Sequence, residues 1–175
     1  MELLSIDPRE FQLRPHEAFN YRALLLTAGS FEEGKFNTMT IGWGFTGTMW
    51  SEPMMVVAVR PTRYTFGFME NYPDFTVTAF PKTFQRDLNI LGTRSGRDGD
   101  KLAQTKLHAV AANHVGAPTF AEAELSVECK KLYWVDLDPK HFLDPAIHKL
   151  YELKDYHRIY YGRIEAIYGT VEYKA

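Results

Sequence analysis

Met54-Met55-Val56-Val57-Ala58-Val59 is the longest apolar run in this 175-residue chain. The run is continuous rather than alternating, which is typical of a strand that is covered on both faces. Pro61 follows closely and ends the strand, because proline has no amide hydrogen to donate to a neighbouring strand. The sequence therefore predicts that residues 54–59 form the most buried strand of a sheet.

Two further strands are predicted before this run. Residues 23–28 and 38–43 are rich in the apolar and β-branched side chains that strands favour. Between them stand Glu33-Gly34-Lys35, whose glycine can take the positive φ that a tight turn often demands. These segments predict the first hairpin.

Strand patterns recur along the rest of the chain. Residues 75–80 are apolar and β-branched, and residues 124–129 alternate between polar and apolar with the period of a half-buried strand. Residues 131–136 continue that strand, and residues 157–167 form a long aromatic and β-branched stretch. Many strands with a few helices predict an α+β fold that is mainly β, most simply a small antiparallel barrel.

Short helices are predicted between these strands. Thr62 and Thr65 are alternative N-caps for a helix that runs through residue 70. Apolar residues recur with helical spacing over 84–91, and Gly92 is placed to end that helix. A third helix is expected over residues 100–111, because its first residue is an aspartate, a good N-cap.

The composition and the start of the chain argue against several classes of protein and partner. The chain holds 20 Lys and Arg against 22 Asp and Glu, with no long basic run, which argues against nucleic acid as a partner. The start of the chain lacks the features of a secretory signal, and no apolar run has the roughly 20 residues of a membrane helix. The single cysteine, Cys129, excludes an intrachain disulfide and is expected in the core. We expect one domain over residues 1–175 in a cytoplasmic protein.

A candidate anion site follows the buried strand. Arg60 and Arg63 stand three residues apart around Pro61, so both guanidinium groups can converge on one phosphate, helped by the hydroxyl of Thr62 or Thr65. The alternative is a pair of surface arginines engaged in structural ion pairs.

A second candidate anion site is the polar stretch from residue 93 to residue 101. Ser95 offers a hydroxyl, Gly96 a flexible backbone amide and Lys101 a cation. Such a loop can cradle an anion. Its alternative interpretation is a solvated surface loop.

The run Asn37-Thr38-Met39-Thr40-Ile41-Gly42-Trp43 places hydroxyls and a glycine beside an aromatic ring at a strand end. Trp43 is either a stacking partner for a flat ring or a core residue. His157 opens the last strand and either reaches a ligand or packs among the aromatic residues there. Together with the arginines, this pattern suits a phosphorylated aromatic cofactor.

Three other kinds of site are not supported. Residues 42–47 match the spacing of a dinucleotide-binding fingerprint, but neither the required helix nor the acidic residue follows. No His and Cys pattern predicts a metal site. No G-x-S-x-G elbow points to a hydrolase.

Four motifs in order resemble the flavin reductase-like, FMN-binding split-barrel family. They are Asn37–Trp43, Val59–Thr65, Leu91–Gly96 with Asp100 and Lys101, and His157–Gly162. The resemblance covers residues 15–170. It implies a split β-barrel with a few peripheral helices that forms a homodimer, with FMN in a groove near the subunit interface.

The resemblance also implies roles for individual residues. Asn37, Thr38, Met39 and Thr40 would line the flavin ring and its ribityl chain. Arg60, Arg63 and Thr65, with Thr62 beside them, would hold the phosphate, and Ser95, Gly96 and Lys101 would approach it or the ribityl chain. Trp43 and His157 would flank the ring, with His157 the one candidate catalytic residue.

Three functions remain open on these grounds. The first is a reductase in which NADH or NADPH passes hydride to the flavin, which then passes electrons to an unidentified small acceptor. The second is a flavoredoxin-like electron carrier that binds FMN but has no nicotinamide site. The third is a small-ligand barrel that has lost the flavin. Because the cofactor carries the chemistry of the first two, no side-chain acid or base is obligatory.

Overall fold

A computed structural model describes residues 2–175 and contains one large antiparallel sheet. Seven strands follow one another across it in the order β3-β2-β6-β9-β10-β5-β4, and β1 adds to β10. Every pairing is antiparallel. The large-sheet strands are β1 (Leu4–Ser5), β2 (Leu24–Ser30), β3 (Lys35–Ile41), β4 (Gly44–Met49), β5 (Glu52–Val59), β6 (Asp74–Ala79), β9 (Leu125–Asp136) and β10 (Arg158–Gly169).

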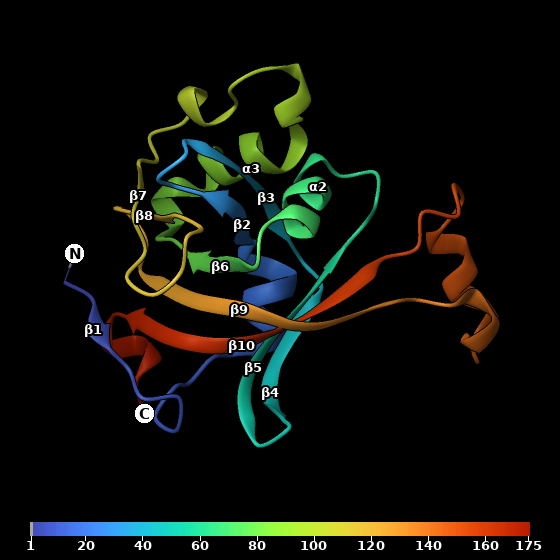
Figure 1. The fold of residues 1–175 in the computed structure, drawn as a ribbon, viewed down its shortest axis with the longest axis horizontal. Helices are drawn as coiled ribbons and strands as arrows, with labels where there is room; N and C mark the ends of the chain where they lie inside the picture. Colours follow the sequence, from blue (N-terminus) through green and yellow to red (C-terminus); the bar gives the residue numbers. More distant parts are fainter. Residues whose placement is uncertain (1) are drawn as a thin grey trace.

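Short helices and a small two-stranded sheet complete the fold. The helices α2 and α3 lie beside β2 and β3 (Figure 1). The α-helices are α1 (Pro15–Glu17), α2 (Tyr64–Asn71) and α3 (Gln85–Thr93), and the small sheet consists of β7 (Ala109–Val110) and β8 (Thr119–Phe120). A π-helix spans Ala18–Arg22, and short 3-10 helices span Lys82–Phe84, Gly96–Asp98, Leu102–Gln104, Pro139–His141, Pro145–Leu150 and Val171–Tyr173. No helix within residues 2–175 combines the length and the apolar character needed to cross a membrane.

The predicted strand over residues 54–59 is confirmed as β5, but it is not the most buried strand, because residues 24–29 of β2 are all buried whereas Ala58 of β5 keeps part of its surface exposed. In β5, residues 54–57 and Val59 are buried, and the strand pairs with β10 on one side and β4 on the other. Its side chains enter the main core with those of β2, β6, β9 and β10, and Cys129 is buried there as predicted. Burial of this continuous apolar surface is the main term that stabilises the sheet.

The predicted hairpin is also confirmed. Strands β2 and β3 pair in register from Leu24 with Ile41 to Ser30 with Lys35. Gly34 in the connecting turn has a φ of 64°, which a residue with a side chain adopts only at a cost. The turn therefore depends on the glycine that the sequence places there.

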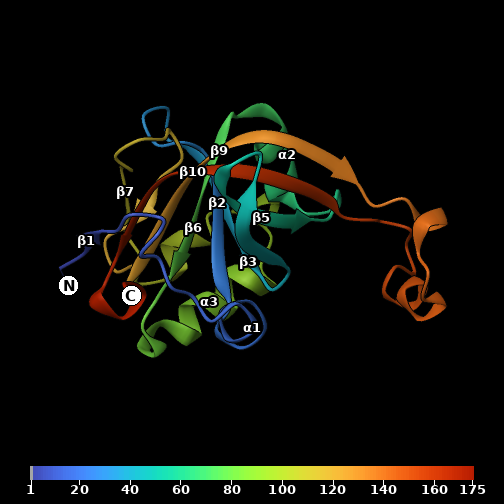
Figure 2. The ribbon, with the colours of Figure 1, turned by 90° about the horizontal axis from the view of Figure 1, so that it is seen from below.

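Strands β9 and β10 form a long hairpin whose connection leaves the body of the molecule. Residues 137–157, here called the arm, project to one side, and both chain termini lie at the opposite end (Figures 1 and 2). Leu143 and Leu153 on the arm are 98% and 82% exposed. The base of the arm returns to the sheet at His157, whose carbonyl accepts a hydrogen bond from the amide of Leu137.

Three local predictions are wrong, and two of them concern helix ends. Neither Thr62 nor Thr65 caps α2, whose N-cap is Arg63. Gly92 does not end α3 but lies within it, where a Cβ would stand 2.3 Å from the Thr40 Oγ1 atom, so glycine lets this helix approach β3 closely.

The third error concerns residues 100–111, which form no α-helix. Asp100 caps only the 3-10 turn Leu102–Gln104 before the chain becomes extended at Thr105. Strand β4 was not among the predicted strands; of the glycines within residues 42–47, Gly42 precedes it, Gly44 begins it and Gly47 lies inside it.

Candidate functional site

A cavity of about 240 Å³, here called the strand-end pocket, lies where β3 ends beside the end of β5. Met39 and Thr40 come from β3, and Arg60 and Arg63 come from the segment after β5. His157 closes the pocket from the start of β10. The cavity thus gathers residues from three of the four motifs found in the sequence.

A second cavity of about 200 Å³, here called the loop pocket, lies between β3, the start of α2 and residues 91–101. It shares Met39, Thr40 and Arg63 with the strand-end pocket. The two cavities are therefore neighbours along one face of β3, and Arg63 stands between them.

Arg63 is the cation best placed to meet an anionic ligand. Its side chain is exposed, and it lines both the strand-end pocket and the loop pocket. Within residues 2–175 its guanidinium has no carboxylate partner, in contrast to that of Arg60. A free guanidinium can make two parallel hydrogen bonds to a phosphate.

Arg60 and Thr62 are engaged by the arm rather than left free. The Arg60 Nη1 atom donates to Asp155 Oδ1 at 2.7 Å, and Nη2 donates to the carbonyl of Leu150 at 2.8 Å. The Thr62 hydroxyl donates to the other Asp155 oxygen at 3.2 Å. Arg60 still lines the strand-end pocket, but both of its Nη atoms serve the base of the arm. The alternative of a structural ion pair therefore describes Arg60, while both arginines line the strand-end pocket, so their convergence on one phosphate stays a prediction.

Asn37 and Thr65 meet at the wall of the loop pocket. The Asn37 Nδ2 atom donates to Thr65 Oγ1 at 2.7 Å, and both side chains are buried. Thr65 accepts this bond, so its own hydroxyl hydrogen remains to be donated. Thr38 differs, because its hydroxyl donates to the Leu26 carbonyl and accepts from Thr27 on the neighbouring strand.

The loop after α3 brings Ser95, Gly96 and Lys101 to the pocket, as the order of the motifs suggested. A Cβ on Gly96 would stand 2.3 Å from Asn37 Oδ1, so the glycine lets the loop lie close to β3. Lys101 is buried, and its ammonium donates to the carbonyls of Leu91 and Arg94. Burial and the neighbouring Arg63 lower its pKa to about 8. Lys101 thus holds the loop against the end of α3.

His157 forms a buried wall of the strand-end pocket. Its ring lies 4.5 Å from the Trp43 ring, and its Nδ1 atom is 2.7 Å from the Tyr151 hydroxyl. Burial and the nearby positive charge of Arg60 lower the pKa of His157 to about 4. The imidazole is therefore uncharged at neutral pH, which removes it as an imidazolium acid and leaves it a positioning role.

The low pKa of His157 makes the stability of the protein depend on pH. Above about pH 6.5 the imidazole is neutral in both the folded and unfolded chains, whereas between about 6.5 and 4 only the unfolded chain takes up the proton. The free energy of unfolding is expected to fall by about 3 kcal/mol over this interval on account of His157. Urea titrations of the native protein and His157→Asn at pH 7, 5.5 and 4.5 measure it. Parallel pH profiles for the two proteins would contradict the assignment.

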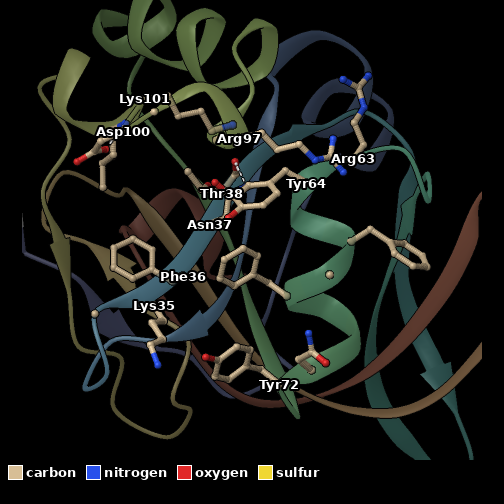
Figure 3. Close-up of a pocket in the computed structure, with 18 of the residues that line it drawn as sticks. Lys35, Phe36, Asn37, Thr38, Arg63, Tyr64, Tyr72, Arg97, Asp100 and Lys101 are labelled. Carbon is tan, nitrogen blue, oxygen red and sulfur yellow. Dashed lines mark hydrogen bonds between the residues drawn. The ribbon is translucent and has the colours of Figure 1, made fainter.

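A third and larger cavity adjoins the loop pocket. This cavity, here called the aromatic groove, has a volume of about 1220 Å³ and lies between the start of β3, helix α2 and residues 96–102 (Figure 3). It shares Arg63, Tyr64 and Arg97 with the loop pocket.

Sequence reasoning missed several of the residues that shape the three cavities. The spacing of Tyr64, Phe68 and Tyr72, four residues apart, was a detectable signal of one helix face. Asp155 and Tyr151 on the arm carried no such signal, because their partner Arg60 is more than 90 residues away.

A group of three or more His, Cys, Asp or Glu side chains that could hold a metal ion is not found in residues 2–175. The groups that converge on β3 are instead one free guanidinium, hydroxyls, backbone and aromatic rings.

Known proteins share this fold and parts of this sequence. A flavoredoxin from Methanosarcina acetivorans superposes with a TM-score of 0.66 at 23% identity, covering 88% of this chain and 71% of that chain. An FMN-binding domain of a flavin reductase-like enzyme from Shewanella baltica superposes with a TM-score of 0.68 at 13% identity, covering 99% and 85%. An uncharacterized protein from Pyrococcus abyssi is 26% identical over 148 residues, which are 83% of this chain and 72% of that protein.

These likenesses confirm the predicted fold, a mainly antiparallel split barrel with a few helices. The family model described as the flavin reductase like domain matches residues 17–172, nearly the whole chain. The chain therefore belongs to the flavin reductase-like domain family.

Proposed function

We propose that this protein is an FMN-dependent oxidoreductase that takes reducing equivalents from NADH or NADPH and passes them to a small acceptor. The observation that carries the proposal is the placement of Arg63, a free cation between two neighbouring pockets on β3. A ligand that spans both pockets needs an anionic end and a flat end, and FMN has both.

The residues present fit this cofactor. Around the loop pocket, Arg63 and the hydroxyl of Thr65 are the groups that would donate to the phosphate, with Ser95 and the Gly96 backbone beside them. Around the strand-end pocket, Met39 and Thr40 would lie along the ring, with Trp43 at its edge. When bound, FMN supplies the electron-transfer chemistry, and the protein supplies binding and orientation.

Two side chains of the strand-end pocket, those of His157 and Arg60, are held in fixed positions by hydrogen bonds. His157 is neutral at neutral pH, and its hydrogen bond with Tyr151 fixes the plane of the imidazole against Trp43. Arg60 is neutralised by Asp155. We expect these two residues to act by positioning the pocket walls rather than by moving protons.

An exposed apolar face supports association of two chains. Single exposed apolar residues are common, but a contiguous group on one face marks an interaction surface. On one face of the sheet, the exposed apolar residues of β4, the turn after it and the far half of β9 are Phe45, Met49, Trp50 and Tyr133. We propose that a second copy of the chain covers this face, as in a symmetric dimer. Light scattering on the purified protein gives the mass that checks it.

A second candidate is an electron carrier that binds FMN without a nicotinamide site. The fold shared with a flavoredoxin supports this candidate. A flavin-free ligand barrel would leave Arg63 without a function.

One anaerobic titration separates these functions. The purified protein is loaded with FMN, and NADH or NADPH is added while the flavin absorbance near the visible maximum is recorded. Bleaching by either nucleotide supports the reductase. Bleaching only by dithionite supports the electron carrier. Failure of the protein to quench FMN fluorescence on mixing would overturn both.

A further inference from the structure

Tyr151 is the one buried residue in the arm from residue 137 to residue 156. Every other residue of this stretch keeps part of its surface exposed, and Leu143 is 98% exposed. The Tyr151 ring lies against the body of the molecule, with its centroid 6.4 Å from that of Trp43 in the wall of the strand-end pocket. The arm therefore supplies one side chain to the layer behind that wall.

Arg60 and an aromatic neighbour hold Tyr151 in place. Arg60 Nη2 donates to the carbonyl of Leu150, the residue before Tyr151, and Nη1 donates to Asp155. The Arg60 guanidinium also lies 4.9 Å from the Tyr151 ring centroid. Phe142 stacks on Tyr151 with the ring centroids 6.0 Å apart. Tyr151 thus has a fixed position, although most of the arm around it is exposed.

The Tyr151 hydroxyl decides which nitrogen of His157 carries a hydrogen. The hydroxyl oxygen lies 2.7 Å from His157 Nδ1, and no other hydrogen bond within residues 2–175 uses this hydroxyl. Burial raises the pKa of Tyr151, so the hydroxyl keeps its hydrogen at neutral pH. A buried hydroxyl donates to the acceptor within its reach, which here is Nδ1. Because the imidazole is neutral at this pH, its one hydrogen is then on Nε2.

The Nε2 atom of His157 is open to the strand-end pocket. No hydrogen bond within residues 2–175 uses Nε2, yet no buried side-chain nitrogen or oxygen in this part of the chain lacks a partner. Nε2 therefore reaches solvent, and the cavity that His157 lines is the strand-end pocket. The pocket thus holds one neutral imidazole donor beside the guanidinium groups of Arg60 and Arg63.

We propose that Tyr151 is a positioning residue that keeps the hydrogen of His157 on Nε2, so that the imidazole donates to an uncharged acceptor atom of the ring bound in the strand-end pocket. A neutral donor suits a carbonyl oxygen or an unprotonated ring nitrogen, whereas a guanidinium suits an anionic group. The flavin ring carries both kinds of uncharged acceptor. This use of the donor rests on the proposed function, but the position of the hydrogen does not. Through Tyr151 the arm acts on the ring site, although Tyr151 does not itself line the pocket.

Nitrogen NMR of the flavin-free protein tests the position of the hydrogen. Imidazole nitrogens with and without a hydrogen have well-separated shifts, and His157→Gln identifies the His157 signals among those of the six histidines. At neutral pH we expect the native protein to carry the hydrogen on Nε2 alone. Tyr151→Phe keeps the buried ring but removes the hydroxyl, so a mixture of the two tautomers is expected. Tyr156→Phe is the matched control, because its ring lies 4.9 Å from that of Tyr151 and its hydroxyl makes no hydrogen bond within residues 2–175.

Riboflavin affinity tests what the hydrogen is used for, because riboflavin has the ring without the phosphate. Loss of one neutral hydrogen bond weakens binding about fivefold, and this loss is expected for His157→Asn. His157→Gln should stay within about twofold of the native protein, because the glutamine amide nitrogen can take the place of Nε2, whereas that of asparagine takes the place of Nδ1. Tyr151→Phe should lose about threefold, since only part of its molecules present the donor. Tyr156→Phe should match the native protein.

Three results would overturn the proposal. A native protein with the hydrogen on Nδ1 would have no imidazole donor in the pocket. Equal riboflavin affinity in the native protein, His157→Asn and Tyr151→Phe would show that the ring does not use the donor. Equal losses in Tyr151→Phe and Tyr156→Phe would show that the two rings only hold the arm in place. In each case FMN binding by the native protein leaves the proposed function standing, whereas absence of flavin binding removes that function and the ligand role of His157 together.

Discussion

Replacing Arg63 with alanine is expected to weaken FMN binding about 100-fold while riboflavin affinity changes less than about threefold. Arg63 is exposed and lines both the loop pocket and the strand-end pocket, and its guanidinium has no carboxylate partner among residues 2–175. Each charge-assisted hydrogen bond contributes about 1.5–3 kcal/mol, so loss of a two-bond contact costs roughly 3 kcal/mol, which is about 100-fold in affinity. Riboflavin lacks the phosphate and therefore does not use this contact.

Arg60→Ala is the matched control for this experiment. Arg60 carries the same charge three residues earlier, but its Nη atoms are bound to Asp155 and the Leu150 carbonyl. We expect Arg60→Ala to change FMN affinity only a few-fold and to loosen the arm, which hydrogen exchange over residues 138–155 would report. Equal losses of FMN affinity in the two variants would show that both arginines bind the FMN phosphate. A parallel loss of riboflavin in Arg63→Ala would place Arg63 at the ring instead.

Gly162→Val is expected to lower the free energy of unfolding by about 3 kcal/mol. A Cβ at this position would lie 2.5 and 2.6 Å from ring atoms of Phe75 and 3.0 Å from the Cβ of Cys129. Both of those side chains are fully buried in the main core, so neither can swing into solvent. Forcing extra atoms into such a core typically costs about 1–3 kcal/mol, and valine adds three of them.

Gly47→Val tests whether this cost comes from crowding rather than from losing a glycine. Gly47 also lies in a strand, but no atom stands within 4 Å of the position that a Cβ would take there, so a change within about 0.5 kcal/mol is expected. Combining Gly162→Val with Phe75→Leu should recover part of the loss, because the smaller side chain vacates the space. Chemical denaturation of the native protein, the two glycine variants, Phe75→Leu and the double variant measures these differences. Additive effects in the double variant would contradict direct crowding by Phe75.

The strands were predictable because their signals are local. The continuous apolar run of β5, the alternation of β9 and the glycine of the β2–β3 turn each express a rule of backbone geometry within a few residues. The errors arose where local preference was weak. The first residues of β4 are rich in glycine and carry no strand pattern, yet pairing with the edge of β5 makes them a strand. Asp100 suggested a helix over residues 100–111, but Leu102 and Leu107 are instead drawn to the second core cluster beside α3.

The candidate site was predictable only in part. The order of the motifs identified the segments that meet at the loop pocket and the strand-end pocket, because each of these segments lies at a strand end or in the loop after a helix. It did not show that Thr65 accepts a hydrogen bond from Asn37, nor that Lys101 donates to carbonyls at the end of α3. A polar side chain binds whichever partner the fold brings within reach, and that partner is absent from the local sequence.

The amino-acid sequence by itself determined most strands of the large sheet, the first hairpin, the buried cysteine and the set of groups available to a phosphorylated ring. The tertiary structure alone decided which of two similar arginines is free. Asp155, which lies 95 residues from Arg60 in the sequence, accepts a hydrogen bond from Arg60 and makes none with Arg63. The tertiary structure also decided that β3 and α2 enclose the aromatic groove. Secondary structure follows from preferences within a few residues, whereas the charge and shape of a site follow from contacts between distant segments, which only the folded chain brings together.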